Sequence, residues 1–285
     1  MSSRASEIED YSNLWLFHPI SHRLAKALSK TPVHPNMVSF AGAVFGVLAA
    51  INYYHYDQGN SALLAFFYML VWHVLDGTDG QLARLTGKAT TAGRAIDGMA
   101  DHLVYISVYV ALALALTEQM SGFVFIWALV AGASHALQAS LLDRQRQVYL
   151  FWVYSGKAGG KPSRPIPPKS KFLKGLHMYF QITADYFDSS DIPRHLAYDL
   201  KIGKSGSELA SAYYRKNYVN YLHTWSLVSP NAHTAAIFIF AYMGQPLYYF
   251  MFEIFVMNAI VFILLKLKKH KDAAFCDWMK NVKRK

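Results

Sequence analysis

The sequence of 285 residues has few charged residues and almost no cysteine. Charged residues make up 16% of the chain and hydrophobic residues 53%, whereas soluble domains average about 25% charged and 45–50% apolar residues. This composition excludes a disordered chain and argues against an ordinary soluble enzyme. The one cysteine, Cys276, excludes an intrachain disulfide. The first 30 residues lack the apolar run of a signal peptide, so we expect no cleavable leader.

Lysine and arginine are absent from three stretches, 37–75, 102–142 and 223–265. Each stretch is apolar and has a polar or Gly-Pro turn near its centre, which is typical of a helical hairpin. A bilayer is crossed by about 20 residues of helix, so each hairpin supplies two spans. The predicted spans are 37–55, 61–79, 98–117, 121–142, 224–243 and 246–266.

The basic residues between these stretches indicate the topology. They all fall on one side of the predicted spans, which by the positive-inside rule is the cytoplasmic side. Both termini are therefore expected in the cytoplasm. The excess of ten positive charges then reflects topology and anionic lipid headgroups, and we expect no nucleic-acid partner.

The sequence thus predicts an all-α integral membrane protein with six transmembrane helices. An amphipathic stretch at 10–30 predicts an N-terminal interfacial helix, and a long cytoplasmic insertion follows the fourth span. The predicted organisation is a cytoplasmic N-terminal segment 1–36, spans one to four in 37–142, a cytoplasmic loop with amphipathic segments 143–222, spans five and six in 223–266, and a basic cytoplasmic tail 267–285.

Four aspartates lie where the second and third predicted spans reach the cytoplasm. Asp76 and Asp79 are three residues apart, and Asp97 and Asp101 are four apart, so each pair shares one helix face. The short connection 85–92 makes the two spans antiparallel neighbours, which lets the faces meet. Converging carboxylates repel unless a cation lies between them, and oxygen ligands favour Mg²⁺ or Mn²⁺.

Small and polar residues accompany the aspartates. Gly80 and Ala83 lie on the same helix face as Asp76 and leave room for a flat group to approach the backbone. Arg84 and Thr90 offer contacts for phosphate. His73 and His102 flank the cluster, in either a structural or an orienting role.

This segment resembles the signature of the CDP-alcohol phosphotransferase (CDP-alcohol phosphatidyltransferase) family of membrane phospholipid synthases. The family pattern D-x2-D-G-x2-A-R-x8-G-x3-D-x3-D is matched at every fixed position between Asp76 and Asp101. The segment 33–39 is similar to the family's T-P-N-x-x-[ST] pattern, with His34 in place of threonine.

The resemblance implies an activity and roles for these residues. Two divalent cations would be held by Asp76, Asp79 and Asp97, while Asp101 would contact one metal and act as the general base. The acceptor hydroxyl would attack the donor phosphorus, and CMP would leave. The resemblance assigns the CDP donor to Pro35, Asn36, Gly80, Ala83, Arg84 and Thr90.

The substrates stay open at this point. CDP-diacylglycerol with a polar acceptor is favoured, because basic residues near the same face could hold a phosphorylated acceptor: Arg144, Arg146, Arg215 and Lys216. The alternative is a small CDP-alcohol donating to a lipid hydroxyl. We also expect a homodimer in the bacterial inner membrane, with the active site facing the cytoplasm.

Three rival functions are a cation transporter, a non-catalytic scaffold and a metal-dependent lipid phosphatase. A transport path should place charges at several depths, but only Glu253 lies deep in a predicted span. An isolated carboxylate facing lipid costs a few kcal/mol. We therefore expect Glu253 to face the bundle or a dimer interface, bonded to Asn258 or to a hydroxyl from a neighbouring helix.

Overall fold

The computed structural model describes residues 6–154, five separate positions between 175 and 186, and residues 204–283, without the side chains of 91–99, 204–207 and 283. Every regular element in these parts is helical, which confirms the all-α class. The main helices are α1 (His18–Leu28), α2 (Pro35–Tyr54), α3 (Ser61–Leu85), α4 (Thr91–Met120), α5 (Val124–Tyr154), α8 (Lys204–Thr224), α9 (Pro230–Tyr242), α10 (Pro246–Met251) and α11 (Asn258–Lys283).

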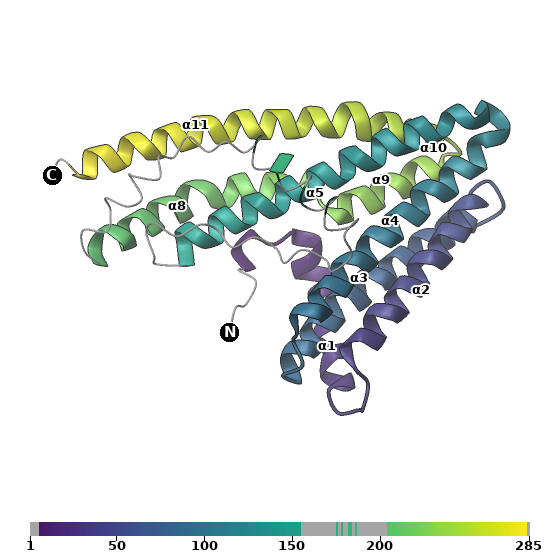
Figure 1. Ribbon diagram of the computed structural model, residues 1–285, viewed down its shortest axis with the longest axis horizontal. Coiled ribbons are helices and arrows are strands. Elements are labelled where there is room, and N and C mark those ends of the chain that lie inside the picture. The colour runs from purple at the N-terminus through teal and green to yellow at the C-terminus, as the bar shows by residue number, and fades with distance from the viewer. Residues whose placement is uncertain are drawn as a thin grey trace.

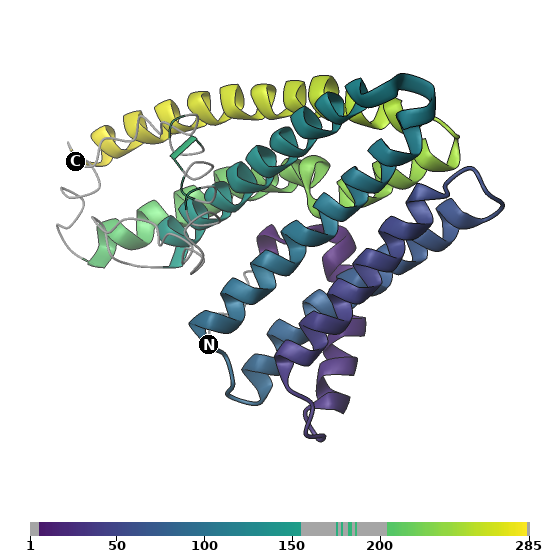
Figure 2. The same ribbon diagram turned by 45° about the vertical axis from the view of Figure 1, so that its right-hand side comes forward.

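The helices form two groups that meet along α4, α5 and α9 (Figure 1). In the first group, α2 packs against both α3 and α4, and α1 packs against α3. In the second, α5, α8 and α11 lie side by side and extend away from the first group (Figures 1 and 2). Within the described residues, the core therefore runs from the α2–α4 packing to the α5–α8–α11 bundle.

Four stretches of helix in the described chain are long and apolar enough to cross a membrane: Pro35–Tyr54, Ser61–Leu85, Ala100–Tyr154 and Pro246–Val282. The third stretch folds back on itself at the short helix η3 (Ser121–Phe123), where Ser121 has a φ of 52°. It contains α4 and α5, which matches the predicted polar turn between the third and fourth spans. The protein is an all-α integral membrane protein.

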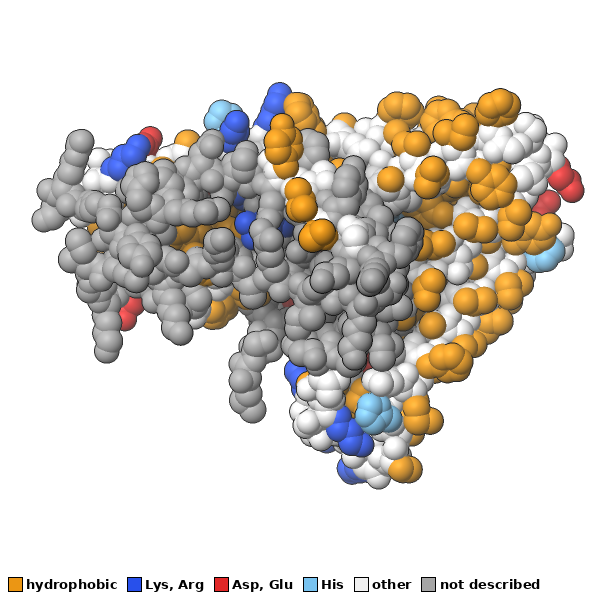
Figure 3. Space-filling model, in the orientation of Figure 1, with side chains coloured by type: hydrophobic (Ala, Val, Ile, Leu, Met, Phe, Trp, Pro, Cys, Tyr) orange, Lys and Arg blue, Asp and Glu red, His pale blue; other side chains and the backbone are white. Residues whose placement is uncertain are grey.

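The outer face of α2 is suited to lipid. Met37, Phe40, Val44, Val47 and Ile51 recur every three or four residues and are all more than 40% exposed, so they form one apolar stripe along the helix. In Figure 3 hydrophobic side chains cover the part of the molecule where α2 and the ends of α4 and α5 lie, and Lys and Arg gather elsewhere.

The fifth predicted span, 224–243, differs from the single helix that we expected. It is divided into η4 (Trp225–Val228) and α9, which has 13 residues. Ser229 is extended and its side chain caps α9, while Pro230 occupies the first turn. Proline there lacks the N–H that a continuous helix would use. At this length α9 falls short of the roughly 20 residues that a span needs.

The segments predicted to be a loop and a basic tail hold more regular structure than expected. The sixth span and the basic tail are one continuous helix over Pro246–Val282, and α8 packs between α5 and α11. The Tyr218 hydroxyl donates to Asp272 over 2.7 Å, and Lys268 pairs with the same carboxylate over 2.7 Å. Lys268 is therefore buried and not available to headgroups. Between residues 155 and 203 of the predicted loop, only five separate positions lie within the described residues.

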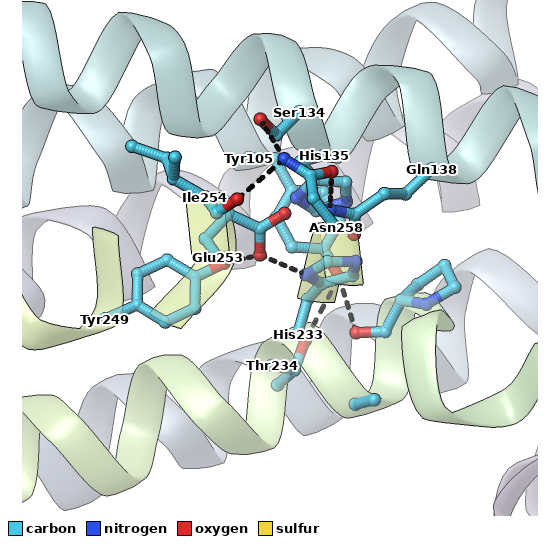
Figure 4. Close-up of polar contacts among 12 residues, drawn as sticks. Tyr105, Ser134, His135, Gln138, His233, Thr234, Tyr249, Glu253, Ile254 and Asn258 are labelled. Carbon is cyan, nitrogen blue, oxygen red and sulfur yellow. Dashed lines mark hydrogen bonds and ion pairs between the residues drawn. The ribbon is translucent and has the colours of Figure 1, made fainter. Parts of the chain in front are cut away.

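A buried polar network joins α4, α5, α9 and α10 (Figure 4). Glu253 lies in a π-helical stretch, η5 (Phe252–Met257), and is fully buried. Its Oε2 lies 2.9 Å from His233 Nδ1 and accepts a hydrogen bond from the Tyr249 hydroxyl over 3.3 Å. The chain of contacts continues to the Tyr109 hydroxyl, 2.6 Å from that of Tyr249, and to His135 Nδ1, 3.1 Å from Tyr109.

The expectation that Glu253 faces the bundle is confirmed, but Asn258 is not its partner. Asn258 accepts from the amide of Gln138 over 2.9 Å and donates to Ser134 Oγ over 2.9 Å. The nearest ring nitrogen to the Glu253 carboxylate belongs to His233, whose ring stacks on that of His135 with centroids 3.8 Å apart. Glu253 thus lies in a π-helical turn, a form that is frequent at functional sites.

We predict that Glu253→Gln keeps the fold, whereas Glu253→Leu destabilises it. Glutamine retains an oxygen that can accept from His233 and Tyr249, but leucine leaves the buried His233 Nδ1 without this partner, at about 1–3 kcal/mol. Thermal unfolding of the purified protein in detergent measures the difference. Equal midpoints for the two variants would contradict this role for the carboxylate oxygen.

Candidate functional site

The first two aspartates project from the last turns of α3. Asp79 is 4% exposed, and its Oδ2 accepts a hydrogen bond from Ser39 Oγ of α2. Ser39 is the residue that sequence reasoning did not assign to the site, although it ends the segment 33–39 quoted above. Its hydroxyl orients the Asp79 carboxylate and ties α2 to α3.

The position of Ser39 follows from how α2 begins and packs. His34 is extended and its Nδ1 accepts the backbone N–H of Asn36 over 3.3 Å, so histidine caps the helix where threonine was expected. Pro35 is buried at the first position of the helix and Asn36 is exposed. A Cβ on Gly46 would lie 2.3 Å from a Val104 methyl. The glycine therefore permits α2 to lie directly against α4.

The third and fourth aspartates lie on α4, which runs back antiparallel to α3 after a turn at Gly87, where φ is 67° (Figure 1). Asp76, near the end of α3, and Asp101, on α4, are both half-buried. The side chain of Asp97 lies outside the described residues. Among the described side chains, no three His, Cys, Asp or Glu residues form a ready metal site.

Gly80, which follows Asp79 in the motif, is not required by the packing of the described residues. A Cβ on Gly80 would meet Arg84 Nη1 at 3.5 Å, an ordinary contact, whereas a Cβ on Gly77 would lie 2.7 Å from Ser21 Oγ of α1. Gly77 thus serves the packing of α1, and Gly80 leaves space beside the aspartates. Ala83 is half-buried on the same face.

The polar residues expected to contact the donor lie at the surface. Arg84, in the last turn of α3, and Thr90, just before α4, are both exposed.

The carboxylates on α3 and α4 fit a hard divalent cation such as Mg²⁺ or Mn²⁺, because these ions prefer carboxylate and phosphate oxygens. Asp76, Asp79 and Asp101 are the described residues that could hold it.

The four basic residues considered for the acceptor differ in their surroundings. Arg215 of α8 pairs with Glu7 over 3.2 Å, and the hydroxyls of Tyr149 and Tyr154 donate to the same carboxylate over 2.9 and 2.7 Å. Partial burial alone would raise the pKa of Glu7, but the tyrosine hydrogen bonds and the Arg215 charge lower it overall. This ion pair fastens the N-terminal segment to α5 and α8.

The other three basic residues lie on α5 and α8. Lys216 is exposed on α8, while Arg144 and Arg146 are half-buried on α5. Arg146 Nε is buried, and within the described part of the chain it has no hydrogen-bond partner. An anionic group beside α5 would satisfy that donor.

Comparison with known families identifies the part of the chain that holds the site. Residues 32–164 match the model for CDP-alcohol phosphatidyltransferase. This part of the chain is similar to CDP-alcohol phosphatidyltransferase domains. It includes α2 to α5 with all four aspartates, and it leaves α8 to α11 unmatched.

Two curated relatives cover parts of the same region. The archaetidylinositol phosphate synthase of Pyrococcus horikoshii is 33% identical over 92 residues, which are 32% of this chain and 47% of that protein. The inner membrane protein YnjF of Escherichia coli strain K12 is 30% identical over 136 residues, 46% of this chain and 62% of that protein. The chain therefore spans about half to three fifths of these relatives.

We predict that Gly80→Leu weakens binding of a CDP-alcohol while the protein stays folded. The substitution removes a poor helix former, which favours the helix by up to about 1 kcal/mol, but it fills the space beside the aspartates. Donor affinity by calorimetry and thermal unfolding measure the two effects separately.

Gly46→Ala is the matched control for this substitution. Its new methyl meets Val104 in the packed interface between α2 and α4, so we expect a lower unfolding midpoint instead of a specific loss of donor affinity. Wild-type donor affinity in the Gly80→Leu protein would show that the nucleotide binds elsewhere.

Proposed function

We propose that this protein transfers a substituted phosphate from a CDP-alcohol to an acceptor hydroxyl, with release of CMP, in phospholipid biosynthesis. The observation that carries the proposal is the complete aspartate motif on α3 and α4, beside a glycine that the described packing does not need. The family of residues 32–164 supports the same reaction class.

In this reaction the residues of the chain bind the CDP donor, orient its phosphates and provide the general base. Gly80 and Ala83 admit the CDP group, while Arg84, Thr90 and the Pro35–Asn36 segment hold its phosphates and cytidine. Asp76, Asp79 and Asp97 would hold two divalent cations, either Mg²⁺ or Mn²⁺, with Asp101 on one of them. When bound, such ions neutralise the diphosphate and stabilise the leaving phosphate.

Asp101 accepts the proton of the acceptor hydroxyl at a carboxylate oxygen. The new P–O bond forms to the acceptor oxygen as the bond to the oxygen of CMP breaks, so no covalent enzyme intermediate is required. Ser39 holds the Asp79 carboxylate in one orientation through its hydrogen bond, which limits the reorganisation needed when a cation binds.

For the donor we favour CDP-diacylglycerol, with a polar phosphorylated acceptor. The support is the unmet donor of Arg146, together with Arg144 on the same helix and Lys216 on α8, which packs against α5. Arg215 already pairs with Glu7, which makes it the weakest of the four candidates. We place the active site and both termini on the cytoplasmic side of a bacterial inner membrane, in a homodimer.

The deciding experiment measures CMP release from CDP-diacylglycerol by the full-length protein in detergent, with and without a phosphorylated acceptor such as glycerol phosphate. We expect release to depend on the acceptor and to stop when EDTA removes divalent cations. Equal release without acceptor would indicate a lipid phosphatase, and full activity in EDTA would exclude the metal-dependent reaction. No release with any CDP-alcohol would refute the proposed function.

We predict that Asp101→Asn loses turnover but keeps donor affinity, because an amide has the size of the carboxylate and cannot accept the proton. General-base removal typically lowers the rate by about 10²–10⁴-fold. Asp76→Ala should instead lose metal and donor binding together. Turnover of Asp101→Asn within a few-fold of the wild type would show that another group is the base.

A further inference from the structure

A buried contact lies one helical turn below the aspartates, toward the membrane interior. His73 precedes Asp76 by three residues on α3, and Tyr105 follows Asp101 by four on α4, so each lies under its aspartate on the same helix face. The Trp72 and Tyr105 rings are in edge contact, with centroids 5.4 Å apart. The two aspartate-bearing helices therefore meet through side chains at this level.

Thr234 of α9 joins the two sides of this contact. Its Oγ1 lies 2.9 Å from His73 Nε2 and 3.2 Å from the Tyr105 hydroxyl, and Thr234 is 2% exposed. Tyr105 donates to the Pro230 carbonyl over 2.7 Å. These distances allow one continuous chain of hydrogen bonds. His73 Nε2–H donates to the Thr234 hydroxyl, Thr234 donates to the Tyr105 hydroxyl, and Tyr105 donates to the Pro230 carbonyl.

The start of α9 fixes where Thr234 stands. Ser229 Oγ accepts the Ala232 N–H over 3.4 Å and donates to Asp10 Oδ2 over 2.6 Å. Asn231 donates to Ser12 Oγ over 2.7 Å. The break at Ser229 and Pro230 is thus held by the N-terminal segment, and it places Thr234 one turn into α9.

We propose that Thr234 is a positioning residue for the aspartate cluster. Its hydroxyl contacts both α3 and α4 and so sets their separation at this level, and with it the separation of Asp76 from Asp101. Thr234 lies outside residues 32–164, so the unmatched C-terminal part of the chain supports the site in the matched part. This inference rests on the proposed function through the metal ions that the aspartates would hold.

The test compares Thr234→Val with Thr234→Ser in the full-length protein. Valine keeps the shape of threonine without the hydroxyl, whereas serine keeps the hydroxyl. The measurement is binding of Mn²⁺ alone, followed by electron paramagnetic resonance without any substrate, together with thermal unfolding. Loss of groups that orient metal ligands commonly weakens metal binding by about 10–100-fold. We expect a loss of about tenfold or more for Thr234→Val and wild-type affinity for Thr234→Ser.

Thr224→Val is the matched control, because the Thr224 hydroxyl bonds only to the Tyr221 carbonyl of its own helix, over 2.6 Å, among the described contacts. We expect it to bind Mn²⁺ as the wild type does. Wild-type affinity in a folded Thr234→Val protein, equal losses in Thr234→Val and Thr224→Val, or no binding of Mn²⁺ by the wild type would each overturn the proposal.

If Thr234→Val does not fold, Tyr105→Phe removes the other hydroxyl of the series and is judged by the same criteria.

Two further results separate this inference from the proposed function. If the wild type binds Mn²⁺ and Thr234→Val weakens it, but no CDP-alcohol releases CMP, the positioning role stands and the proposed function fails. If CMP is released but Mn²⁺ affinity is unchanged in Thr234→Val, the positioning role alone fails.

Discussion

The packing of α2 against both α3 and α4 is the constraint on which the rest of the site depends. Gly46 lets the α2 backbone lie against Val104, and Ser39 bonds to Asp79. One helix therefore fixes the two helices that bear the aspartates. Because protein interiors are close-packed and resist compression, a shift of α2 would move both carboxylate pairs. The opposite face of α2 carries only an apolar stripe toward lipid, so its inner face alone determines where it lies.

The membrane makes each buried polar group between the helices expensive unless it is bonded internally. The structure meets this demand with hydroxyl groups that both donate and accept, such as those of Tyr109, Tyr249 and Thr234. Glu253 is held by His233 and Tyr249 in a π-helical turn. These contacts join α9 and α10 to α3, α4 and α5, where hydrophobic packing gives little preference between protein and lipid. Polar pairing thus determines how the C-terminal helices dock.

Much of the architecture could be predicted because its signals are local. The missing Lys and Arg located the apolar hairpins, and the spacing of Asp76, Asp79, Asp97 and Asp101 located the candidate site. The prediction of the fifth span at 224–243 did not include the break at Ser229 and Pro230, because hydropathy gives no signal for it. The partner of Glu253 could not be found either, because His233 is twenty residues away and meets it only through the hairpin. The same holds for Ser39 and Asp79, forty residues apart.

The interruption at Pro230 is where the two parts of the chain depend on each other. A continuous helix over 224–243 would have no capped start at Ser229 to bond Asp10 of the N-terminal segment. The observed break instead fixes the first turn of α9 from one side by Asp10 and from the other by Tyr105. Thr234 then lies at a defined depth beneath Asp76 and Asp101. The break thus lies close to Thr234, whose hydroxyl contacts both α3 and α4.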